Sequence, residues 1–358
     1  MIDHDLLLEV QAIGDQRRAE RRRFIKMAGA GIAATGGLAA LSACGDNAPS
    51  PPPSVATPTP SATATTSAND VAVLNFALNL EYLEANYYNF AAQGSGLSMQ
   101  LQAGVGTQGA VIGGRQVAFS DTSVAAYARE IASDELLHVL FLRSQLGSSA
   151  IAQPAINIDG SATGAFTAAA RAAGVVSATG TFDPYMNDDT FLLGAALLTD
   201  VGVTAYKGAA TLINSKVILE AAAGILAVEA YHSGLIRTLL YRRAVQTPAP
   251  TATAPMDRTI IGQISVARDT LDGTVTAAGP PQVFANDDQG VGPITFMPPT
   301  PANGSIRSNI VPSDTNAIVF GRRAANVLNI AYLNKAAVTS GGFFPAGVNG
   351  SINTSAAN

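Results

Sequence analysis

Four long segments of the chain repeat their hydrophobic positions every three or four residues, which is the period of an amphipathic α-helix. They span residues 70–92, 121–145, 188–213 and 219–243. The last segment is apolar nearly all round, so we expect it to be buried. Asn214 and Ser215 allow a short turn between the last two segments, which therefore pack antiparallel. The pattern predicts an all-α fold built on a four-helix bundle.

The segments between and after these helices differ in composition. Residues 94–114 are rich in Gly and Gln and predict a long loop, whereas residues 148–187 are rich in Ala, Gly and Pro, with a short helix at 165–173. Further helices are expected at 260–271 and 322–334. The apolar residues of the C-terminal third are too scattered for a core of their own, so we expect this extension to wrap around the bundle.

Two of the helices carry the same pair of polar residues inside an apolar stretch. The chain has three histidines, and two of them end a Glu-x-x-His: Glu135 with His138 and Glu229 with His232. Residues three apart lie on one face of a helix, one turn from each other. A carboxylate and an imidazole are costly to bury unless something pairs them. The repeat therefore predicts a shared site inside the bundle.

Glutamates of the first helix extend this pattern. In carboxylate-bridged bundles that hold two metal ions, two helices each supply a Glu-x-x-His and the other two each supply a Glu. Glu81 lies on the apolar face of the first helix, and Glu84 borders that face one turn on. Imidazole nitrogen and carboxylate oxygen suit iron and manganese, and two cations would neutralise buried acids. We therefore expect iron or manganese, as one or two ions.

The third helix is the weak point of this site. Its acid near mid-height is Asp200, preceded by Thr199, and no Glu is available there. Aspartate is one methylene shorter than glutamate, so Asp200 could ligate one metal without bridging two. The site is then complete with Asp200, reduced to one metal, or degenerate. The predicted ligands are Glu81, Glu84, Glu135, His138, Asp200, Glu229 and His232.

The same residues also allow a purely structural interpretation, in which ion pairs or hydrogen-bonded core histidines need no metal. A single Glu-x-x-His often arises by chance on a helix surface. Two in one chain, each in an apolar helix, favour the metal site. Tyr88 and Tyr231 are candidate redox-active neighbours, although an aromatic residue at helical spacing more commonly packs in a core.

The N-terminal region is typical of an exported lipoprotein. Arg21–Lys26 (R-R-R-F-I-K) resembles a twin-arginine export signal, and the uncharged run at 27–43 is too short for a convincing membrane span. The run leads into Leu-Ser-Ala-Cys, similar to a bacterial lipobox in which Cys44 is lipidated after cleavage. An ordinary signal peptide with an incidental cysteine is the alternative. The following Pro, Ser and Thr residues predict an extended tether.

The chain thus divides into a signal peptide (1–43), a lipid-anchored linker (44–68), the bundle (69–246) and the C-terminal extension (247–358). We expect the mature protein in the periplasm or cell envelope, held at a membrane by the lipid on Cys44. A net charge of −5 gives no electrostatic reason to expect a nucleic-acid partner. A single cysteine excludes an internal disulfide.

Several segments of the chain carry a family resemblance. They read L-N-L-E-Y-L-E-A-N-Y-Y (78–88), D-V-G-V-T-A-Y-K-G-A-A (200–210), A-A-A-G-I-L-A-V-E-A-Y-H-S-G (221–234), N-I-V-P-S-D (309–314), V-L-N-I-A-Y (327–332) and G-G-F-F-P-A-G-V-N-G (341–350). In these segments the chain resembles the ferritin-like proteins of the desiccation-related group, over most of residues 69–350. The resemblance implies the bundle fold. Relatives usually read Phe-Glu-Asp where this chain has Leu198-Thr199-Asp200, so the third helix departs from the family pattern.

Two functions remain as alternatives. The first is an exported ferritin-like metalloprotein that uses iron or manganese for redox chemistry in stress protection, such as Fe(II) oxidation or peroxide disposal. Its partners are a metal ion or a small-molecule oxidant. The second is a non-enzymatic, surface-anchored protein with a structural or stress-protective role and a degenerate metal site. A closed iron-storage shell is disfavoured because the tether and the C-terminal third would obstruct it, while a small homo-oligomer stays open.

Overall fold

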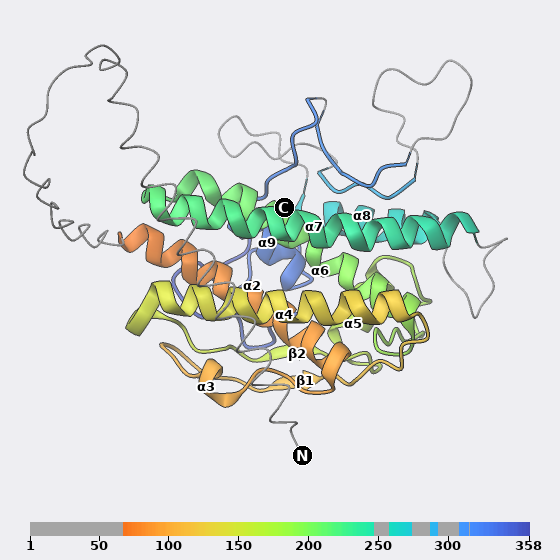
Figure 1. The fold of residues 1–358 in the computed structure, drawn as a ribbon, viewed down its shortest axis with the longest axis horizontal. Helices are drawn as coiled ribbons and strands as arrows, with labels where there is room; N and C mark the ends of the chain where they lie inside the picture. Colours follow the sequence, from red (N-terminus) through yellow and green to blue (C-terminus); the bar gives the residue numbers. More distant parts are fainter. Residues whose placement is uncertain (1–66, 247–257, 274–286, 293–307, 315) are drawn as a thin grey trace, which may run out of the picture. The chain divides into compact units, whose positions relative to one another are not determined.

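The four long helices expected from the sequence form a bundle (Figure 1). They are α2 (Ala68–Gln93), α4 (Thr122–Leu146), α6 (Asp188–Ala209) and α7 (Lys216–Gln246). The structure is a computed structural model that describes residues 67–246, 258–273, 287–292, 308–314 and 316–358. The expected signal peptide, Cys44 and the linker up to residue 66 lie outside the described residues. For the described part of the chain, the predicted all-α bundle is confirmed.

Polar residues fix where the helices begin. Ser67 caps α2 by accepting a hydrogen bond of 3.1 Å from the backbone N–H of Asp70. Asp70 is therefore not the cap. Its carboxylate accepts a 2.7 Å bond from the backbone N–H of Asn214 and so joins α2 to the turn before α7. Asp121 caps α4 by the same use of a side-chain oxygen.

α2 and α6 form the interior of the bundle. Of the 26 residues of α2, 20 are buried, and 18 of the 22 residues of α6 are buried. α2 packs along α4, α6 packs along α7, and α2 also contacts α6 between the two pairs. The central helices are therefore covered on nearly every face, which makes their polar side chains the informative ones.

The outer face of α7 corrects one expectation from the sequence. The apolar run at 219–243 predicted a helix buried all round, yet Tyr231 is 77% exposed and Leu219 is 36% exposed. Ala223, Ala227 and Ala230 also lie on the exposed face. Alanine is apolar but small, and it favours a helix without requiring burial. The apolar composition of α7 therefore predicted more burial than the structure shows.

The connection from α2 to α4 and the connection from α4 to α6 meet as a small parallel sheet. β1 (Val111–Gly113) lies beside β2 (Ile156–Ile158), with Ile112 opposite Asn157. Both strands fall in segments that were expected to be loops. The short helices of these connections are α3 (Met99–Gln102), η1 (Gly147–Ser149) and α5 (Ala165–Ala172). α5 confirms the short helix predicted at 165–173.

The C-terminal extension packs on the bundle, as expected for a wrapping segment. Its helices are α8 (Arg258–Asp272) and α9 (Ala324–Ala331). Within the bundle, the short 3₁₀ helix η2 (Ala210–Leu212) follows the end of α6. α9 contacts α6, and α8 contacts α7. The described part of the extension belongs to one compact unit with the bundle, spanning residues 64–358. Among the described helices, no stretch has the length and apolar character that a membrane crossing requires.

Candidate metal centre

Three helices bring acidic and imidazole groups to one point inside the bundle. Four buried side chains each offer a ligand atom within 4.8 Å of the others: Glu81 of α2, Glu135 and His138 of α4, and Glu229 of α7. These residues were all predicted from the sequence. Their convergence places both Glu-x-x-His pairs at a common centre, because His232 lies next to Glu135.

His138 contacts a carboxylate from each of the three helices. Its Nδ1 atom lies 3.2 Å from Oε2 of Glu81, 3.5 Å from Oε2 of Glu135 and 3.6 Å from Oε1 of Glu229. One imidazole cannot satisfy three carboxylates at the same time, since one ring nitrogen carries at most one proton. The arrangement therefore has more acceptors than the protein itself can pair.

The second histidine is held from both sides. Nδ1 of His232 lies 3.1 Å from Oε1 of Glu135, and Nε2 lies 3.3 Å from Oδ2 of Asp134. The rings of His138 and His232 have their centroids 6.4 Å apart. Metal-binding histidines usually donate their other ring N–H to a carboxylate, and Asp134 is placed to accept it. Asp134 was not among the predicted site residues, and its available sequence signal was its position directly before Glu135.

Glu84 also belongs to this centre, and α6 makes room for it. Oε2 of Glu84 accepts a 3.4 Å hydrogen bond from the hydroxyl of Thr199, which lies 2.6 Å from the hydroxyl of Tyr88. A Cβ atom at Gly202 would lie 2.9 Å from Oε1 of Glu84 and 2.7 Å from Oε2 of Glu229. α6 therefore contributes space and a hydroxyl where a bundle of this type usually has a carboxylate. We name Glu81, Glu84, Glu135, His138, Glu229 and His232 the carboxylate–histidine cluster.

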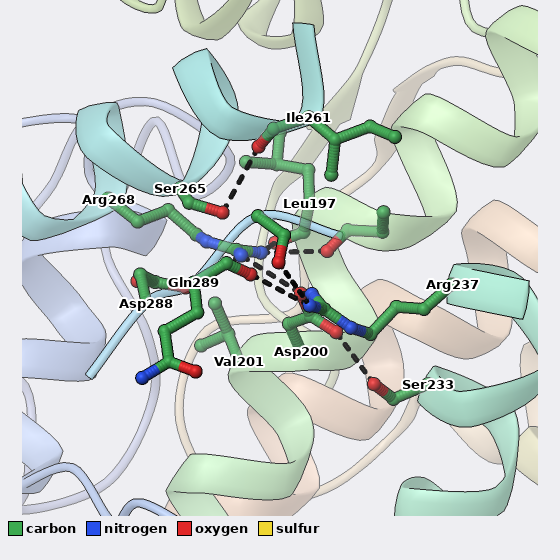
Figure 2. Close-up of polar contacts among 12 residues, drawn as sticks. Leu197, Asp200, Val201, Ser233, Arg237, Ile261, Ser265, Arg268, Asp288 and Gln289 are labelled. Carbon is green, nitrogen blue, oxygen red and sulfur yellow. Dashed lines mark hydrogen bonds and ion pairs between the residues drawn. The ribbon is translucent and has the colours of Figure 1, made fainter. Parts of the chain in front are cut away.

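The structure places Asp200 in a different set of contacts (Figure 2). Its Oδ1 accepts a 2.6 Å bond from Ser233, and its Oδ2 accepts bonds of 2.8 Å from Arg237 and 3.0 Å from Arg268. Burial alone would raise the pKa of Asp200, but the two guanidinium groups outweigh it and hold the pKa below its usual value. Consecutive side chains on a helix point about 100° apart. Because Thr199 faces Glu84, Asp200 points away from the carboxylate–histidine cluster and towards Arg237. We leave Asp200 out of the proposed ligands.

Of the two tyrosines predicted as neighbours of the site, Tyr88 lies near it and Tyr231 does not, while Tyr206 was not predicted. Tyr206 of α6 donates a hydrogen bond to Oε1 of Glu81 and is buried. It had no sequence signal apart from lying seven residues after Thr199, two helical turns along the same face. Tyr88 reaches the cluster through the Thr199 hydroxyl. Tyr231 is exposed and its ring lies on the outer face of α7, so its place on the surface argues against a redox role beside the metal.

Burial and mutual repulsion make these acids reluctant to ionise. Burial raises the pKa of Glu81 to about 7, and burial with neighbouring carboxylates raises the pKa of Glu84 and of Glu229 well above the usual value. Glu135 differs, because contacts with His138 and His232 overcome its burial and lower its pKa. Burial would lower the pKa of His232, but Asp134 and Glu135 raise it to about 10. Without metal, protons therefore take up part of the charge.

Several of the donor atoms are left without a hydrogen bond. Among the described residues, both carboxylate oxygens of Glu135, Oε2 of Glu229 and Nδ1 of His232 are buried and have no hydrogen-bond partner of good geometry. Such atoms are rare in folded proteins and call for an explanation. Imidazole nitrogen with several carboxylate oxygens suits iron or manganese. Two divalent cations would also balance the four carboxylates with both histidines neutral, so the residues present fit the expected metal.

Comparisons with known proteins show the family of the chain. Residues 69–242 match the Ferritin-like domain family. Desiccation-related protein PCC13-62 of Craterostigma plantagineum is 30% identical over 256 residues, which cover 71% of this chain and 74% of that protein. Ferritin-like catalase Nec2 of Nesocodon mauritianus is 26% identical over 287 residues, covering 79% of this chain and 84% of that protein. No solved structure gives a match to the chain. The chain therefore belongs to the ferritin-like family of desiccation-related proteins.

Proposed function

We propose that this chain is an exported ferritin-like metalloprotein that binds iron or manganese in the carboxylate–histidine cluster and uses it to break down peroxide. The observation that carries the proposal is the set of buried ligand atoms on Glu135, Glu229 and His232 that have no hydrogen bond of good geometry within the described residues, although Glu135 and His232 lie in ion-pair contact. A protein that kept these groups for packing alone would gain by replacing them with apolar residues. A bound metal gives every one of them a partner.

The choice of peroxide rests on access and on one relative. The side chain of Glu135 is fully buried, whereas those of His232, His138 and Asp134 are 7%, 10% and 20% exposed. The histidine edge is therefore the side of the cluster closest to solvent, and its small exposed fraction favours a small oxidant over a bulky substrate. A relative that covers most of the chain is named a ferritin-like catalase.

The chemistry balances without a further reductant. Two molecules of hydrogen peroxide give two of water and one of oxygen, so one peroxide is reduced while the other is oxidised. Bound iron or manganese supplies the reversible change of oxidation state. The chain's own residues hold the site in place: Tyr206 orients Glu81 by its hydrogen bond, and Asp134 keeps the proton on Nε2 of His232 so that Nδ1 stays free to bind.

The test starts from purified protein that is stripped of metal by chelation and reloaded with Fe(II) or Mn(II). We expect about two metal ions per chain, as in related bundles, and release of oxygen from hydrogen peroxide. Protein loaded with Zn(II) is the matched control, because zinc binds similar donors but has no redox chemistry. Metal content is measured by elemental analysis and oxygen with an electrode.

Two other outcomes would favour the alternatives. Protein that binds neither iron nor manganese, with the same Tm in their presence and absence, supports a non-enzymatic surface protein with a degenerate site. Thr199 in place of a carboxylate on α6 is the observation that favours this second function. Oxidation of Fe(II) without oxygen release from peroxide would point to iron oxidation as the activity.

Export and anchoring are part of the proposal and rest on the N-terminal sequence. We expect a Cys44→Ser variant to move from the membrane fraction to the soluble fraction of a bacterial host, because Cys44 follows Leu41-Ser42-Ala43 at the place where a lipid is attached. Cell fractionation with detection of the protein measures this. An unchanged membrane fraction would contradict the lipid anchor.

A further inference from the structure

A second group of acids lies where the C-terminal extension meets the bundle. Asp269 and Asp272 stand three residues apart at the end of α8, and Asp287 follows later in the chain. Each of the three offers one oxygen within 4.8 Å of the others. None of them belongs to α2, α4 or α7, so this group is separate from the carboxylate–histidine cluster.

Arginine partners account for only part of this group. Nε of Arg322 donates a 2.6 Å bond to Oδ2 of Asp272, and Nη2 donates a 2.9 Å bond to Oδ1 of Asp287. The remaining oxygens, Oδ1 of Asp272 and Oδ2 of Asp287, are buried and have no hydrogen-bond partner within the described ranges. The residues that carry them are 0% and 3% exposed. A buried, unpaired carboxylate oxygen is costly unless a cation or a proton meets it.

The charge around this group is unbalanced. Asp288 bridges two guanidiniums, contacting Arg268 through Oδ1 at 2.6 Å and Arg322 through Oδ2. Arg268 continues to Asp200, which also pairs with Arg237 (Figure 2). Counting Asp269, Asp272 and Asp287 with Asp288 and Asp200, five carboxylates face three guanidiniums, which leaves a net charge of −2. One divalent cation would remove that excess.

Burial beside other acids also shifts the pKa values of this group. Burial and the neighbouring acids, chiefly Asp288, raise the pKa of Asp269 to about 8. Burial raises the pKa of Asp272 to about 7, although Arg322 opposes the rise. Without a cation, protons therefore have to supply part of the missing positive charge near neutral pH.

We propose that Asp269, Asp272 and Asp287 form a second metal site, which binds one Ca²⁺ ion and ties the end of α8 to the rest of the extension. The donors are all carboxylate oxygens, without nitrogen or sulfur, and such sets select hard cations. Calcium accepts irregular arrangements of six to eight oxygens, so water can complete its shell on the partly exposed side at Asp269. The site is structural and does not depend on redox chemistry in the bundle.

Asp269→Asn is the variant that tests this site. Asp269 is half-buried and, among the described residues, forms no salt bridge with Arg268 or Arg322. Its Oδ1 accepts a 3.3 Å hydrogen bond from the backbone N–H of Asp288, and the amide oxygen of an asparagine can accept the same bond. We expect calcium to raise the Tm of the chelated full chain by roughly 5 °C at a hundredfold excess over Kd. The variant should lose this rise and bind calcium at least about tenfold more weakly.

Calorimetric titration with Ca²⁺ gives the stoichiometry, with one ion per chain expected. The titration is done on protein whose carboxylate–histidine cluster is filled with Zn(II), which suits imidazole ligands better than an all-oxygen set, so that loss of the proposed redox activity and loss of this site are distinguishable. Glu130→Gln, an exposed acid on α4, is the matched control and should respond like the original protein. An unchanged Tm with calcium, or an equal response in Asp269→Asn, would overturn the proposal. If the original protein binds no calcium and Asp269→Asn is more stable than it in chelator, the proposal is also overturned. The three aspartates would then be a group that shares protons and binds no cation.

Discussion

Glu229→Gln is expected to abolish metal binding while making the metal-free protein more stable. Glutamine keeps the shape of the side chain but removes the charge that a cation needs. Loss of a residue that merely supports a metal ligand costs 10–100-fold in affinity, so loss of a direct ligand should cost at least about 100-fold, with peroxide breakdown falling alongside. Elemental analysis and oxygen release measure the two losses.

The gain in stability follows from the same carboxylate. Burial, and after it the charges of Glu135 and Glu84, raise the pKa of Glu229 well above its model-peptide value of 4.5. A carboxyl group with a higher pKa in the folded state takes up a proton on folding. The stability of the metal-free protein therefore falls as the pH rises from about 4.5 towards the pKa of Glu229 in the folded state. Removing the charge should therefore raise the free energy of unfolding at pH 7 by on the order of 1 kcal/mol.

Glu220→Gln is the matched control for this experiment. Glu220 lies on the exposed surface of the same helix, α7, so its amide should change neither metal content nor stability by more than about 0.5 kcal/mol. If Glu229→Gln destabilises the metal-free protein and leaves peroxide breakdown intact, Glu229 is a structural ion-pair partner, as the alternative interpretation of the Glu-x-x-His pairs requires.

Gly202→Ala should damage the metal site without damaging the fold. A Cβ atom at this position would lie 2.7 Å from Oε2 of Glu229 and 2.9 Å from Oε1 of Glu84, and both contacts are with the ends of flexible side chains. The carboxylates can move aside, so the helix tolerates the change and gains up to about 1 kcal/mol of helix propensity. Displaced ligands hold metal less well, and we expect affinity to fall by roughly 10–100-fold.

Gly224→Ala provides the comparison on a helix of the same bundle. A Cβ atom at Gly224 would have no neighbour within 4 Å, so the variant should show the gain in helix propensity and unchanged metal affinity. The free energy of unfolding of the metal-free forms and titration with Mn(II) measure the two effects. Equal metal affinity in the two variants would show that Glu84 and Glu229 do not act together in binding.

The helices and five of the six residues of the carboxylate–histidine cluster could be predicted from their spacing along the chain. Glu135 with His138 and Glu229 with His232 are local pairs, and helical periodicity alone points each pair inward. Glu81 follows from the apolar face of α2. Glu84 could be named only as a neighbour of that face, because its role depends on Thr199 and Gly202 across the bundle.

Asp200 shows where prediction from spacing ends. Asp200 is a carboxylate near the middle of its helix, as a metal ligand would be. Its partners Arg237 and Arg268, however, lie 37 and 68 residues further along the chain. Periodicity cannot pair residues at such separations, and one helical position decides whether a side chain faces the centre or the outside. The small sheet was missed for a related reason, since β1 and β2 are three-residue strands whose pairing is not local.

α2 is hydrogen-bonded to a segment far along the chain, near residue 349. The side-chain amide of Asn79 in α2 donates a 2.9 Å hydrogen bond to the backbone carbonyl of Asn349, and its Oδ1 accepts a 3.0 Å bond from the backbone N–H of Asn349. Asn79 stands two positions before Glu81. During synthesis α2 therefore leaves the ribosome some 270 residues before its final partner. This contact of α2, the helix that supplies Glu81 and Glu84, therefore cannot form until residue 349 has been synthesised, and contacts between residues so far apart in the sequence slow folding.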